Sequence, residues 1–305
     1  MDVDWRKVAT FLSLTFAIAW TTALVLFLSP VQYGSAAATV LVVAGYMWAP
    51  AIAALLTQWR WGESLRTGTG LYRGRVGWVA LAWLAPLAVL GGTIGIGATF
   101  PGVSFTTDYG VFLAEMGLPP EQIEASIAAL ESFPGPPAVV LLGQALVSGL
   151  TVNAVAALGE ELGWRGLLLN ELAPLGFWRL SFVTGLAWGP WHAALIVQGH
   201  NFPGAPLLGI VVMTAWTVAA SPMFTYLTLR AETVLAPTFF HGSFNAVASL
   251  SLVYLTGASN LLLSPVGVAG IGAAIVGTVV CSMHDRFVAA QRVTTGKPVD
   301  QIPSK

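Results

Sequence analysis

Long apolar stretches almost without charged residues dominate this sequence. A helix needs about 20 apolar residues to cross a hydrocarbon core about 30 Å thick, and eight stretches come close to that length. They cover residues 8–29, 34–57, 78–99, 137–159, 179–198, 206–229, 236–255 and 261–283. The sequence therefore predicts an all-α fold, a polytopic transmembrane helix bundle of about eight spans.

The composition supports a membrane protein and excludes other classes. Only 9% of the residues are charged, against about a quarter in soluble proteins. The formal net charge is -1, so no basic field exists to hold nucleic acid. The single Cys281 cannot form an intrachain disulfide. We expect residues 1–305 to form one integral membrane domain with the lipid bilayer as its environment.

The positive charges indicate how the chain is oriented. All 13 Lys and Arg residues fall on one side of the expected spans, and cytoplasmic loops retain such residues. These residues are Arg6, Lys7, Arg60, Arg66, Arg73, Arg75, Arg165, Arg179, Arg230, Arg286, Arg292, Lys297 and Lys305. Both termini are therefore predicted to be cytoplasmic, in a multi-pass protein of a prokaryotic cell membrane.

The longest connection on the other side, residues 101–136, contains acidic residues and no Lys or Arg. Within it, Pro119-Pro120 followed by Glu121 resembles a helix start, and Ile123, Ile127 and Leu130 share one helical face. We expect a short amphipathic helix here, lying on the outer surface.

Ionisable residues at membrane depth are costly and indicate a functional site. Glu160, Glu161 and Arg165 lie in G-E-E-L-G-W-R-G at the end of the fourth stretch. If the helix continues, Glu161 and Arg165 pair at i and i+4, and Glu160 lies on a neighbouring face. One carboxylate is then neutralised and the other is available, although a polar helix end with two solvated acids is an equal alternative for this motif alone.

Two further motifs place polar side chains inside expected spans. His192 follows Trp188 by four residues in W-G-P-W-H, and His241 precedes Asn245 by four in H-G-S-F-N. Each pair shares a helix face. Either pair alone could serve helix packing, but a carboxylate, two imidazoles and an amide on adjacent spans favour a common site.

This set of groups is suited to hydrolysis. A carboxylate with histidines activates water as a general base, and His with Asn stabilises an oxyanion. H-E-x-x-H and G-x-S-x-G are absent, and every Asp lies outside the expected spans. Two noncatalytic alternatives remain: a membrane scaffold or bacteriocin-immunity protein, and a proton-coupled transporter, whose relays also use Glu and His.

The three motifs resemble the CPBP intramembrane proteases, the CAAX-protease and bacteriocin-processing (ABI) family that includes the prenyl-protein endopeptidase Rce1. The family pattern is E-E-x-x-x-R, F-x-x-x-H and H-x-x-x-N, and it is matched in order within residues 137–250, the expected catalytic core. Trp188 stands where the family usually has Phe, which puts the pocket shape in question.

The resemblance implies an intramembrane endopeptidase acting on membrane-associated or prenylated protein substrates. It implies that Glu160 activates water with help from His192, that His241 and Asn245 stabilise the oxyanion, and that Glu161 and Arg165 hold the site together. It also implies a site recessed in the membrane and open towards the cytosol.

Glu160, His192 and His241 also form a two-His-one-carboxylate set typical of catalytic zinc. Asn245 suits oxyanion donation better than zinc binding, and no clear carboxylate in the spans is expected to orient the imidazoles. We therefore predict a glutamate mechanism without a metal cofactor, with a Zn²⁺ metalloprotease as the alternative.

Overall fold

The computed structural model describes residues 2–64 and 68–295, and three of the basic residues discussed above, Arg66, Lys297 and Lys305, lie outside these ranges. The described chain is a helical polytopic bundle, as the sequence predicts. Its β-structure is a two-stranded antiparallel ladder between β1 (Ser104–Phe105) and β2 (Leu255–Thr256).

The helices of the first half are α1 (Trp5–Leu28), α2 (Ala36–Leu41), the π-helix η1 (Val42–Met47), α3 (Ala49–Trp61), α5 (Val76–Leu84), α6 (Pro86–Gly97), α7 (Tyr109–Glu115), α8 (Pro120–Glu131) and α9 (Pro137–Leu150). Those of the second half are α10 (Val152–Glu161), the π-helix η2 (Leu162–Leu167), α11 (Leu168–Leu172), the 3₁₀-helix η3 (Ala173–Leu175), α12 (Phe177–Trp191), α13 (Ala193–Ile196), α14 (Pro206–Ala231), α15 (Leu235–Val247), the 3₁₀-helix η4 (Ala248–Leu250), α16 (Ser251–Tyr254), α17 (Asn260–Leu263) and α18 (Val268–Phe287). The short helix expected after Pro119-Pro120 is confirmed as α8.

The expected number of eight spans is wrong. Within the described ranges, five helical segments are long and apolar enough to cross a membrane. These are Trp5–Leu28, Ala36–Trp61, Val76–Gly97, Pro206–Ala231 and Asn260–Phe287. A sixth exists if Pro137–Leu150 and Val152–Leu175, which are bent by 46° relative to each other, count as one span.

The two stretches that do not form full-length helices are 179–198 and 236–255. In the first, Pro190 lacks an N–H donor and the backbone N–H of His192 bonds to Gly189 rather than to Trp188, so α12 ends at Trp191. In the second, α15 passes into the 3₁₀-helix η4 after Val247. Hydropathy alone did not reveal these breaks, which lie beside His192 and Asn245.

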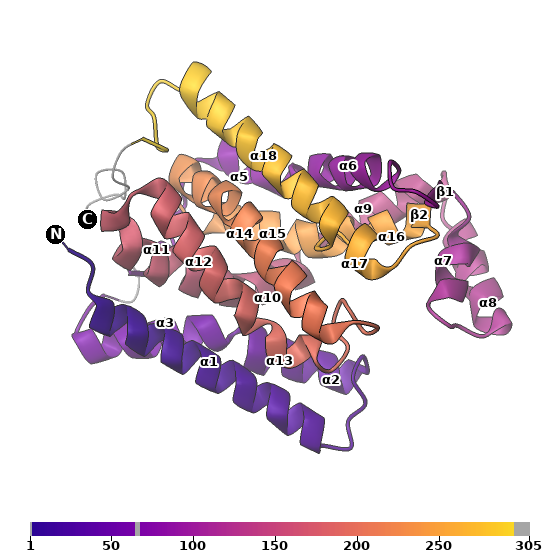
Figure 1. The fold of residues 1–305 in the computed structure, drawn as a ribbon, viewed down its shortest axis with the longest axis horizontal. Coiled ribbons are helices and arrows are strands. Elements are labelled where there is room, and N and C mark those ends of the chain that lie inside the picture. Colours follow the sequence, from indigo (N-terminus) through magenta and orange to yellow (C-terminus); the bar gives the residue numbers. More distant parts are fainter. Residues whose placement is uncertain (1, 65–67, 296–305) are drawn as a thin grey trace.

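The bundle has two distinct ends (Figure 1). The start of α1, α11 and the end of α18 lie at the left of the view, and α7, α8, α16 and α17 lie at the right. The long helices run between these ends, and α12 packs extensively along α14. The segments that carry most of the described Lys and Arg residues, among them the start of α1 and α12 and the end of α14 and α18, lie at this left end, which we call the basic end.

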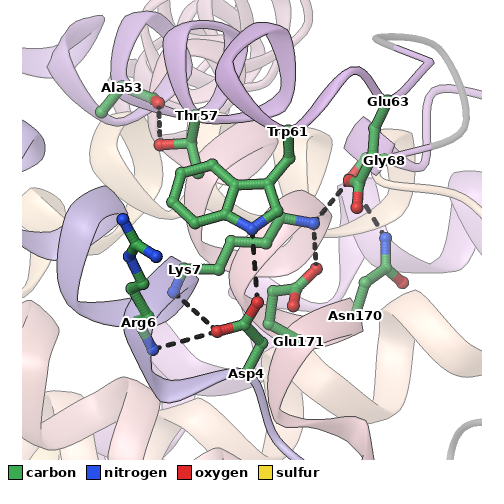
Figure 2. Close-up of polar contacts among 10 residues, drawn as sticks. All are labelled: Asp4, Arg6, Lys7, Ala53, Thr57, Trp61, Glu63, Gly68, Asn170 and Glu171. Carbon is green, nitrogen blue, oxygen red and sulfur yellow. Dashed lines mark hydrogen bonds and ion pairs between the residues drawn. The ribbon is translucent and has the colours of Figure 1, made fainter.

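At the basic end, Lys7 joins three helical segments (Figure 2). Asp4 caps α1 by accepting from the backbone N–H groups of Arg6 and Lys7. The buried Lys7 ammonium then donates to Glu63, just after α3, at 2.5 Å and to Glu171 on α11 at 2.6 Å. We call Lys7, Glu63 and Glu171 the Lys7 clasp; it ties α1 to the rest of the bundle.

Candidate active site

The two adjacent glutamates are positioned by a bent and rewound helix. The chain breaks between α9 and α10 at Thr151, with φ -114° and ψ -98°, and the π-helix η2 follows Glu161 directly. Such π-helical turns are frequent at functional sites. At the same break α15 approaches closely, because a Cβ on Gly242 would lie 2.6 Å from the Gly149 carbonyl oxygen.

Glu161 is fully engaged by buried partners. The Arg165 guanidinium donates to both of its oxygens, at 3.0 and 3.1 Å, which confirms the predicted i to i+4 pair. His241 Nδ1 also bonds to Glu161 Oε1 at 2.8 Å. Since Glu161 is 0% exposed, this carboxylate holds a cation and an imidazole in place and has no free face.

Glu160 lies in a different environment. It is 2% exposed, and its Oε2 accepts a 2.8 Å hydrogen bond from Trp188 Nε1. Among the described residues this indole is its hydrogen-bond partner, so Oε1 is left available. The two carboxylates therefore differ as the spacing predicted: one is neutralised and the other is available.

His192 is oriented by the break in its own helix. Its Nδ1 bonds to the Trp188 carbonyl oxygen at 2.9 Å, the carbonyl that the helix would otherwise pair with the His192 N–H. A carbonyl only accepts, so Nδ1 carries the proton. In the neutral imidazole, Nε2 is then an acceptor.

The expected catalytic side chains line a single cavity of about 290 Å³. Its wall contains Glu160, His192, His241 and Asn245, together with Tyr46, Trp188 and Trp216. Glu160 and His241 are buried, His192 is partly buried and Asn245 is exposed. Glu161 and Arg165 lie behind this wall.

The cavity reaches connecting segments at one end of the bundle. Its other lining residues include His200 and Asn201, between α13 and α14, and Pro265 and Val266, before α18. These connections belong to the end opposite the basic end. On the other side, the Arg165 guanidinium fills the space between the rings of Trp188 and Phe224, at 4.4 and 4.3 Å from their centroids.

One feature of the site is typical of zinc sites, and another is not. Glu161 orients His241 through Nδ1, so the expectation that no carboxylate in the spans would do this is wrong. Yet no three His, Cys, Asp or Glu side chains in the described ranges converge as the ligands of a metal ion would. As placed, Glu160, His192 and His241 share a cavity without forming a ligand cage.

The sequence analysis missed two contacts of the site. It did not assign Trp188 a bond to Glu160, although a buried indole N–H usually finds a partner and Trp188 shares a face with His192. It also did not pair Glu161 with His241, because that contact joins helices 80 residues apart in the chain and local spacing carries no signal for it.

Comparison with known families agrees with the motifs. Residues 142–247 match the family described as type II CAAX prenyl endopeptidase Rce1-like. No curated protein matches the chain. The family match covers α9 to α15 almost completely and contains all three motifs. Residues 142–247 are thus similar to the Rce1-like CAAX prenyl endopeptidases.

Proposed function

We propose that this protein is an intramembrane endopeptidase that hydrolyses membrane-associated protein substrates with a water activated by Glu160. The observation that supports this most is the division of labour between the two glutamates. Glu160 faces the cavity with one oxygen available, whereas Glu161 is hydrogen-bonded to Arg165 and to His241.

In the proposed reaction, the Glu160 carboxylate takes a proton from a water as the water oxygen attacks the carbonyl carbon of the scissile peptide bond. The carbonyl oxygen becomes an oxyanion. Its negative charge is stabilised by Asn245 and by His241, which donates its Nδ1 proton to Glu161 and, in the imidazolium form that the proposal requires, donates from Nε2 to the oxyanion. Collapse of this intermediate breaks the C–N bond, and the departing amine receives the proton from Glu160.

His192 supports the water in this scheme. Its Nδ1 proton is committed to the Trp188 carbonyl, so Nε2 is the atom that accepts a hydrogen bond from the water. No step requires a metal ion. Prenylated or otherwise lipidated proteins are the substrate class that the family description suggests.

The test compares two isosteric variants in a cleavage assay on a membrane peptide library. Glu160→Gln should fold normally and lose at least about 10²-fold in turnover, the usual contribution of a general base. Glu161→Gln should instead lower the free energy of unfolding in detergent by about 3–5 kcal/mol, because it removes the charge partner of the buried Arg165.

Three outcomes would contradict this proposal. If Glu160→Gln retained turnover, Glu160 would not be the base. If cells that carry Glu160→Gln kept the phenotype of cells with the unmodified protein, a noncatalytic scaffold or immunity role would be favoured. Stoichiometric zinc in the active protein, with cleavage lost to a chelator and restored by zinc, would replace the metal-free mechanism.

A further inference from the structure

A second hollow adjoins the candidate active site at the end opposite the basic end. It measures about 540 Å³ and is lined by Phe112, Glu115 and Met116 of the α7 region and by residues of the α16–α17 region. Asn201 and Ser249 line both this hollow and the cavity that contains Glu160. The two hollows therefore adjoin at these residues, and together they extend from α7 towards Glu160.

A smaller hollow lies at the basic end. The hollow there that reaches Arg165 measures about 30 Å³ and does not include Glu160 among its lining residues. The Arg165 guanidinium lies beside it between two aromatic rings and is bound to Glu161. From the α7 side, by contrast, two adjoining hollows lead towards Glu160.

The charge around the route contrasts with that of the basic end. Residues 76–164 contain no Lys or Arg. The exposed acids of the α7–α8 region are Asp108, Glu115, Glu121, Glu124 and Glu131, and the described ion pairs include none of them. Burial lowers the pKa of His200, at the cavity wall, to about 4, so it is neutral at physiological pH and adds no positive charge.

We infer that the peptide substrate of the proposed reaction reaches Glu160 from the end of the bundle opposite the basic end, through the route past α7, Asn201 and Ser249. Because positive charge marks the cytoplasmic side, this end is extracytoplasmic. The substrate is then a peptide at the outer face of the membrane. The acids of α7 and α8 favour a cationic segment beyond the scissile bond.

Thiol labelling tests the side of entry without requiring activity. In full-length protein carrying Cys281→Ala, single cysteines are placed by Ser249→Cys on the route, Ala125→Cys on α8 and Arg6→Cys at the basic end. A membrane-impermeant maleimide added to intact cells should label Ser249→Cys and Ala125→Cys, and should label Arg6→Cys only after permeabilisation. Labelling should also block cleavage by Ser249→Cys.

This inference would be overturned if Ser249→Cys and Arg6→Cys were labelled from the same side of the membrane. It would also be overturned if Ser249→Cys were labelled from neither side. Neither result depends on whether the protein is a protease, so failure of the proposed function is recognised separately, by active-site variants in the cleavage assay.

The preferred charge is measured with two peptide reporters that differ only in a Lys-rich or Glu-rich segment after the cleavage site. At low ionic strength the KM for the Lys-rich reporter should be about tenfold lower, with kcat unchanged. The triple change of Glu115, Glu121 and Glu124 to Gln should remove the difference. Equal KM values in the unmodified protein would overturn the inferred preference for a cationic segment.

Discussion

Adjacent glutamates acquire different roles here through the partners that the fold gives them. Glu160 and Glu161 are both almost fully buried, yet one faces a cavity and the other binds a guanidinium and an imidazole. Unpaired buried charge is expensive. The indole of Trp188 therefore matters, because it donates to the carboxylate that lacks a cation.

Trp188→Phe should separate this hydrogen bond from the packing of the ring. Phenylalanine keeps an aromatic face against Arg165 but has no N–H for Glu160. A hydrogen bond to a charged group is worth about 1.5–3 kcal/mol, so we expect kcat to fall about tenfold or more, with KM and folding little changed. Trp188→Ala should also destabilise the protein by exposing Arg165. A Phe variant with unchanged kcat would show that the bond does not position the base.

At the scale of the helices, the bounds expected from the sequence were most accurate where a helix is long and uninterrupted. The apolar stretches at 8–29 and 206–229 became α1 and α14 with small changes at their ends. The stretches that carry His192, His241 and Asn245 gave shorter helices, because Pro190 and the 3₁₀ segment η4 interrupt them. Hydropathy measures transfer into lipid and does not register where backbone hydrogen bonding changes.

The Glu161–Arg165 pair was easier to predict than the helix ends around it. Spacing alone indicated the Glu161–Arg165 pair, since i and i+4 positions meet on any helix. The Glu161–His241 bond depends on how α15 meets the α9–α10 break. Such contacts arise from packing between helices, and a single sequence does not specify them.

Gly242→Ala should show how strongly this packing controls the site. A Cβ at Gly242 would lie 2.6 Å from the Gly149 oxygen and 2.8 Å from the Ala154 nitrogen, both backbone atoms, so α15 must move away. Overpacking of this kind costs about 1–3 kcal/mol. Because His241 is the preceding residue, we expect cleavage to fall on the order of 10²-fold, as for a displacement of about 1 Å.

Gly143→Ala is the matched control for that variant. Gly143 lies in α9, and a Cβ there meets no atom within 4 Å. This change should leave cleavage unaltered and the thermal midpoint equal or slightly higher, since Ala favours helix over Gly. Equal effects of the two substitutions would mean that the close approach of α15 is unimportant.

For the whole molecule, most ion pairs of the described residues and the loops that line the cavity lie at opposite ends. Apart from the Glu161 network, every ion pair among the described residues is at the basic end. They join distant segments there: Arg75 pairs with Glu232, Arg230 on α14 with Asp285 on α18, and Lys7 with both acids of its clasp. The end with the cavity is held by apolar contacts and hydrogen bonds.

Lys7→Met should test whether the clasp holds α1 on the bundle. The side chain of Lys7 is 4% exposed and those of Glu63 and Glu171 are 44% and 18% exposed, so removing the ammonium leaves Glu171, above all, without its partner (Figure 2). We expect the free energy of unfolding in detergent to fall by about 1–3 kcal/mol.

Arg6→Met removes the same charge from an exposed neighbouring position and should change the free energy of unfolding by less than about 0.5 kcal/mol. If both variants unfolded alike, net charge rather than the clasp would explain the loss. Cleavage per folded molecule should be retained by Lys7→Met, because the clasp lies at the end of the bundle away from the cavity.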